Sequence, residues 1–122
     1  MFTDNYASTA EFDPRSVRIR NMESPRTGNP VSNQFVVESS RYIFFQSYRS
    51  LVAVYDKKER SITLGRAWDY SKTTLKYLHE WLESDAFGTW AYIRDEYRGR
   101  TFSETIRKAI AAGVIDYDDD ME

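Results

Sequence analysis

The 122-residue chain is long enough for one domain with a single hydrophobic core. Aromatic residues make up 16% of it, and because each of them buries a large area, a small number of side chains can form this core. It contains no cysteine, which excludes disulfide frameworks, thiolate catalysis and cysteine-bound zinc. The net charge of −2 and the sequence pI near 5.5 argue against a dedicated binder of the DNA backbone, whose affinity depends on neutralising many phosphates.

The N-terminal part is expected to be a partly ordered arm over residues 1–32, because it holds all three prolines and shows no sustained periodicity. Within it, the alternation at Ser16–Arg20 is compatible with an edge strand. The first residues, MFTDNYASTAEFDP, include acidic side chains and no apolar run. We therefore expect neither a signal peptide nor a membrane span, but a soluble, cytoplasmic protein.

The central part shows β-branched and aromatic runs separated by short polar turns. These runs predict strands at residues 34–39, 41–48, 50–56 and 61–65. Short connections favour an antiparallel meander. In the second of these strands, Ile43 and Phe45 point to one face, whereas Tyr42 and Phe44 point to the other. Both faces are therefore partly apolar, and we expect helices on one face and the N-terminal arm or a partner on the other.

After residue 69 the apolar spacing becomes helical, and one stripe faces the sheet: Leu75, Tyr77, Leu78, Trp81 and Leu82. Asp69 or Ser71 is the natural N-cap of this helix. A second, short helix is expected within residues 86–99, over Trp90–Asp95. A third begins at a capping box formed by Thr101 and Glu104.

The third helix is expected to stop at Gly113, and residues 114–117 to return as a closing strand. The predicted fold is α+β: a four-stranded, mostly antiparallel β-meander followed by two or three helices packed on one face. It occupies a single domain over residues 33–117, and residues 118–122 form an acidic, solvated tail.

The sequence offers no recognisable catalytic set, so we expect a protein that is not an enzyme and that holds no cofactor or metal. His79 is the single histidine, and Glu83 stands where the second histidine of a metalloprotease helix would be. His79 is better explained as a residue on the flank of the helix. There is neither a Gly-x-Ser-x-Gly elbow nor a phosphate-binding loop, and the paired carboxylates are adjacent in sequence rather than opposed across a cleft.

Charge is unevenly distributed along the chain. Residues 31–68 carry six basic side chains against three acidic ones, or +3, and residues 101–122 carry two against six, or −4. Tyrosine and arginine are common anchors of protein interfaces. The candidate partner-binding residues are therefore Arg41, Tyr42, Tyr48 and Arg49 of the sheet, together with Asp118, Asp119 and Asp120 of the tail, where acidic side chains can imitate a phosphate backbone.

Three motifs, Asn-Gln-Phe, Phe-Gln-Ser-Tyr and Trp-Asp-Tyr-Ser-x-Thr-Thr, follow one another within residues 28–83. In this order they resemble a family of small uncharacterised bacteriophage proteins. The matching residues are Asn33, Gln34, Phe35, Phe45, Gln46, Ser47, Tyr48, Trp68, Asp69, Tyr70, Ser71, Thr73 and Thr74. The resemblance implies a virus-encoded protein that works in the cytoplasm of a bacterial cell, and it carries no assigned activity.

The leading functional hypothesis is a non-enzymatic phage accessory protein that binds a bacterial host protein and modulates or inhibits it, as anti-CRISPR proteins do by analogy. One alternative is a module that binds single-stranded nucleic acid with the aromatic and basic face of the sheet. The other alternative is a small structural or self-assembling virion protein, which predicts a homo-oligomer. None of the three requires a membrane.

Overall fold

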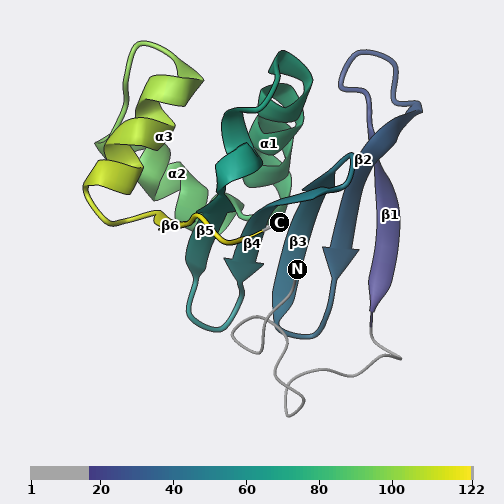
Figure 1. Cartoon of the computed structure of the whole chain (residues 1–122), viewed down its shortest axis with the longest axis horizontal. Coiled ribbons are helices and arrows are strands. Elements are labelled where there is room, and N and C mark those ends of the chain that lie inside the picture. Colours follow the sequence, from purple (N-terminus) through teal and green to yellow (C-terminus); the bar gives the residue numbers. More distant parts are fainter. Residues whose placement is uncertain (1–16, 122) are drawn as a thin grey trace.

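The computed structural model describes residues 17–121, which form one sheet and three α-helices (Figure 1). The strands are β1 (Arg18–Glu23), β2 (Pro30–Glu38), β3 (Tyr42–Ser47), β4 (Ser50–Asp56), β5 (Ser61–Gly65) and β6 (Asp116–Asp118). The helices are α1 (Lys72–Asp85), α2 (Phe87–Glu96) and α3 (Phe102–Ala111), and a short 3₁₀ helix, η2 (Arg66–Asp69), precedes α1.

The sheet has the spatial order β1-β2-β3-β4-β5-β6, so the strands are neighbours in the order of the chain. The first five strands pair antiparallel, whereas β6 pairs parallel to β5. The predicted α+β meander is therefore confirmed, with one further strand at each edge. The edge strand considered at Ser16–Arg20 lies at β1, so Arg18–Glu23 and the residues from Pro30 onward pair in the sheet, and residues 24–29 form the turn between them. The remaining arm, residues 1–16, lies outside the described residues.

The sheet is apolar on both faces, as the alternation in β3 predicted. Ile43 and Phe45 belong to the main core beneath the helices, with Leu78, Trp81 and Leu82 of α1. Figure 1 shows all three helices on this side of the sheet. Tyr42 and Phe44 belong to a smaller cluster on the opposite face, together with Leu51, Val54 and Met121.

The helix boundaries follow from local side-chain chemistry. Ser71, not Asp69, caps α1: its Oγ accepts a hydrogen bond from the amide of Thr74 at 3.1 Å. The expected second helix is confirmed and extends beyond Trp90–Asp95 to the ten residues of α2. In α3 the Thr101 Oγ1 accepts from the amide of Glu104 at 3.1 Å.

The expected capping box is only half formed, because the Glu104 carboxylate accepts from the amide of Arg100 at 2.8 Å instead of reaching back to the amide of the cap residue. Gly113 follows α3 with φ +76°, the left-handed conformation expected at a helix end.

The C-terminal residues follow the edge of the sheet, and Asp119 and Asp120 of the expected acidic tail are exposed. Asp116–Asp118 form β6, and Met121 is buried against the second face of the sheet. A Cβ on Gly65 would lie 3.0 Å from Met121 Cε and 3.2 Å from the carbonyl oxygen of Leu51. A side chain at position 65 would therefore require this segment or the Leu51 backbone to shift by a few tenths of an ångström.

Candidate functional site

A hollow lies where the β3–β4 turn meets the beginning of α1. Its volume is about 720 Å³, within the range of sites that bind ligands or peptide side chains. We call it the hairpin pocket. It is lined by Asn33, Ser47, Tyr48, Arg49, Ser50, Val52, Ala67, Tyr70, Ser71, Thr73 and Thr74.

A chain of hydroxyl groups forms one wall of the hairpin pocket and ties the sheet to α1. Ser47 Oγ, at the end of β3, lies 3.0 Å from Thr74 Oγ1. Ser71 Oγ donates to the same Thr74 oxygen at 3.1 Å. Because Ser71 also caps α1, the helix start is fixed against the strand end. This wall is therefore preorganised.

The opposite rim is held by two residues in the left-handed backbone region. Asn33 has φ 67° and Tyr48 has φ 56°, and the amide of Tyr48 donates to the carbonyl of Asn33 at 2.6 Å. Tyrosine in this region is uncommon, and such a conformation persists only where the surrounding structure enforces it. The Tyr48 side chain is left 48% exposed at the rim.

A buried amide lies directly behind the hydroxyl wall. Gln34 is fully buried, and neither its amide oxygen nor its amide nitrogen has a hydrogen-bond partner. In the β2–β3 register it stands opposite Ser47, so the two side chains lie side by side on one face of the sheet. Most buried polar groups in native proteins are paired. Gln34 is therefore one of the few side chains here that packing alone does not explain.

The pocket and the motifs coincide to a large extent. The lining residues that also belong to the three sequence motifs are Asn33, Ser47, Tyr48, Tyr70, Ser71, Thr73 and Thr74. Residues 17–98 match a known family, whose description is "Family of unknown function (DUF8033)". The chain belongs to this family.

The matched segment of the DUF8033 family contains every strand from β1 to β5, the helices α1 and α2, and the entire hairpin pocket. It ends before α3 and β6. We found no significant match among curated proteins or among solved structures. The family therefore supplies neither an activity nor a ligand, and any function must be argued from the site itself.

The structure separates the four candidate residues of the sheet into two pairs. Tyr48 and Arg49 are exposed and line the hairpin pocket together. Arg41 and Tyr42 lie at the other end of β3. Tyr42 is only 5% exposed, so the exposure assumed for it from the sequence is wrong. The Arg41 guanidinium carbon lies 5.1 Å from the centre of the Tyr42 ring, and the ring centres of Tyr42 and Phe44 are 5.8 Å apart.

Arg41 makes a bidentate ion pair with Asp56, with distances of 3.0 and 2.8 Å. Burial acts to raise the pKa of Asp56, but hydrogen bonds from Arg41 and from the amides of Glu59 and Lys58 outweigh it and lower the pKa below its ordinary value. The pair fastens the start of β3 to the end of β4. Arg41 thus has a structural role at this end of the sheet.

The three candidate aspartates of the tail are not a free acidic run. Asp118 is the last residue of β6, and its Oδ1 accepts from the amide of Asp120 at 3.0 Å. Asp119 accepts from the Tyr117 hydroxyl at 3.0 Å. Asp119 and Asp120 are exposed. The tail aspartates do not line the hairpin pocket.

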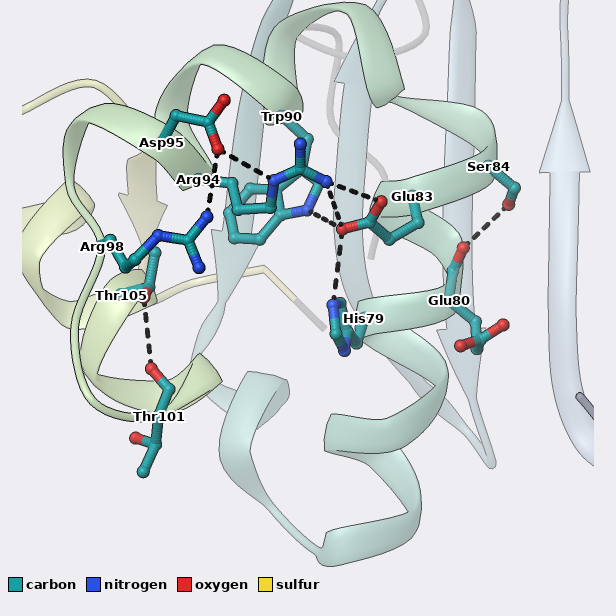
Figure 2. A network of polar contacts seen from close by, with 10 residues as sticks. All are labelled: His79, Glu80, Glu83, Ser84, Trp90, Arg94, Asp95, Arg98, Thr101 and Thr105. Carbon is teal, nitrogen blue, oxygen red and sulfur yellow. Dashed lines mark hydrogen bonds and ion pairs between the residues drawn. The ribbon is translucent and has the colours of Figure 1, made fainter.

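His79 belongs to a polar network that joins α1 to α2 (Figure 2). Its ring stacks on Phe102 with centres 4.5 Å apart, and its Nε2 lies 3.5 Å from Glu83 Oε2. Glu83 also accepts from Trp90 Nε1 at 2.8 Å and from Arg94 at 3.1 Å. This agrees with a histidine on the helix flank.

Burial acts to raise the pKa of Glu83, but the hydrogen bonds from Trp90 and Arg94 and the neighbouring positive charges bring it below its ordinary value. The network is best explained as a clamp between two helices. Within residues 17–121, no three His, Asp or Glu side chains are grouped as metal ligands would be. No helix in the same range combines the length and apolar character of a membrane span.

Sequence reasoning missed Tyr70 as a site residue. Tyr70 is 80% exposed and lines the hairpin pocket, yet from the sequence it was only part of a motif. Ser71 was interpreted only as a possible helix cap, which is correct but incomplete, because Ser71 also lines the pocket. The sequence did contain a signal: one motif ends at the turn after β3, and the next lies at the start of α1. A meander followed by a helix can bring these two places together.

Proposed function

We propose that this chain is a phage-encoded, non-enzymatic accessory protein that binds a bacterial host protein in the host cytoplasm and modulates or inhibits it. We further propose that the rim of the hairpin pocket is the binding surface. The phage origin rests on the motif resemblance alone. The binding role rests on the exposed side chains around the pocket.

The observation that carries the proposal is the cluster of Tyr48, Arg49 and Tyr70 around one hollow. Tyr48 is 48% exposed and Tyr70 is 80% exposed. Tyrosine and arginine are enriched among the residues that dominate interface energies, and such residues are centred on pockets from which water is expelled. A preorganised rim also reduces the entropy lost on binding.

The test is affinity purification of the tagged protein from infected bacteria, followed by reconstitution of the complex from purified components. Tyr70→Ala should weaken the reconstituted complex at least about tenfold, the effect of an interface anchor. Tyr92→Ala is the matched control, because Tyr92 is 63% exposed on α2 and does not line the pocket. Equal affinity of the two variants would refute the pocket rim as the binding surface.

Single-stranded nucleic acid is the second candidate, because two exposed tyrosines beside an arginine offer stacking together with phosphate contact. The aromatic sheet face first considered for this role is less suited to it, since Tyr42 and Phe44 are buried. Fluorescence anisotropy with single-stranded DNA and RNA at low salt separates the two candidates. An absence of binding there would eliminate nucleic acid, because the electrostatic contribution is strongest at low salt.

A further inference from the structure

We propose that the hairpin pocket receives an anionic oxygen group, a carboxylate or a phosphate carried by a side chain of the partner protein, with Arg49 as its charged contact. This inference rests on the proposed function and specifies its chemistry. It follows from the charge of the pocket, from its hydrogen-bonding groups and from the ion pair of Asp69, the acid next to Tyr70.

Arg49 is the charged side chain among the described residues that line the pocket, and no carboxylate lines it. Within residues 17–121, Arg49 takes part in no hydrogen bond or ion pair. Some other arginines are engaged, such as Arg20 with Asp85 at 2.6 Å and Arg94 with Glu83 at 3.1 Å. An arginine fork matches the two oxygens of a carboxylate or a phosphate. The pocket thus has an uncompensated positive charge in a donor geometry suited to an anion.

The remaining polar groups of the pocket can donate hydrogen bonds. Ser50 and Thr73 line it with hydroxyls that make no side-chain hydrogen bond in the described part of the chain. Tyr48 and Tyr70 bring phenolic hydroxyls to the rim. A hydroxyl donates one hydrogen and adapts its direction to the acceptor. These hydroxyls can donate to the oxygens of an anion, and the charge of Arg49 favours an anion over a cation in the same pocket.

The acid next to Tyr70 in the sequence is not paired with Arg49. Asp69 lies just before Tyr70, but it does not line the pocket, and its carboxylate is 3.8 Å from Arg107 of α3. The positive character of the pocket is thus preserved. The tyrosine rings on the rim can contact the apolar part of a segment that carries the anion, which favours an acidic or phosphorylated side chain of a protein over a free ion.

The direct test uses acetate and inorganic phosphate as probes on the full-length protein, at constant ionic strength maintained with chloride. Two-dimensional ¹H–¹⁵N NMR should show saturable shifts at the amides of residues 48–50 and 71–74 and at the side-chain Nε of Arg49. Arg49→Gln should weaken the apparent affinity about tenfold or more, because hydrogen bonds to charged groups contribute on that scale.

Arg60→Gln is the matched control. It removes the same charge at the β4–β5 turn, at the opposite end of β4 from Arg49. We expect this variant to retain the shifts of the native chain. The probe that saturates at the lower concentration identifies the source, acetate for a carboxylate and phosphate for a phosphorylated side chain.

Two outcomes would overturn the inference: shifts that grow linearly without saturation, or equal shifts in Arg49→Gln and Arg60→Gln. The experiments distinguish failure of the anion site from failure of the proposed protein-binding function. A complex that depends on Tyr70 but forms equally with Arg49→Gln refutes the anion site alone. Saturable anion binding without a recoverable host partner refutes the protein-binding function alone.

Discussion

Trp81 lies at the centre of the contact between α1 and the sheet, and its replacement by alanine tests how the core is built. The side chain is fully buried, and its ring stacks on Phe45 of β3 at 6.3 Å between centres. Its indole Nε1 has no hydrogen-bond partner. The contribution of Trp81 is therefore packing and apolar burial, and no hydrogen bond is lost when it is removed.

The magnitude follows from the buried area. An aromatic side chain of this size buries about 200 Å², which at about 25 cal/mol per Å² corresponds to about 5 kcal/mol. Measured truncations of buried tryptophan cost about 3–5 kcal/mol. For a chain of this length, such a loss lowers the Tm by about 12–20 °C. Trp81→Phe should cost only about 1–2 kcal/mol, because it keeps most of the ring contact and removes the unpaired N–H.

Urea unfolding followed by far-UV circular dichroism measures both variants, and an unchanged slope against urea shows that the change lies in stability. Tyr92→Ala serves as the control, with an expected change below about 0.5 kcal/mol, since Tyr92 is 63% exposed. A loss of less than about 1 kcal/mol for Trp81→Ala, at unchanged slope, would refute the reasoning. Such a small loss would mean that Trp81 is not buried between α1 and the sheet.

Two further predictions concern buried polarity and pH. Gln34→Leu should raise the free energy of unfolding by about 1 kcal/mol or more, because both amide atoms are buried without partners. A lower free energy of unfolding in urea for this variant would show that the amide has a partner in solution. The pKa values of Asp56 and Glu83 lie below their ordinary values of 3.8 and 4.5, so the stability they contribute is present above about pH 4.5 and is lost as the pH falls through the folded-state values. Thermal unfolding between pH 6 and 2.5 measures this loss of stability. The Tm of Asp56→Asn should fall less steeply with pH than that of the native chain. An equally steep fall in that variant would show that the ionised Asp56 carboxylate does not contribute to the pH dependence.

Much of the fold could be predicted because its determinants are local. Alternating β-branched and aromatic runs located β4 and β5 at the residues observed, and Ser71 and Thr101 fixed the starts of two helices through their own side chains. The parallel pairing of β6 with β5 could not be predicted in the same way. It depends on where three helices return the chain, which is a tertiary property.

The candidate site was predictable only in part, for a similar reason. Tyr48 and Arg49 were proposed from residue type, because tyrosine and arginine are common anchors of protein interfaces. Tyr42 has the same residue type but faces a second apolar cluster. Its burial depends on what packs on that face, and no pattern within β3 itself encodes this.

The motif residues divide into those that the fold explains and those that it does not. Trp68 is buried in the main core, and Ser71 and Thr74 fasten α1 to the sheet, so the fold accounts for them. It gives no reason for a tyrosine at position 70, which is 80% exposed, or for the unpaired amide of Gln34. Local rules of folding are most often broken at functional sites. Because Tyr70 lines the hairpin pocket and Gln34 stands behind its wall, both exceptions support the proposal that the binding surface lies there.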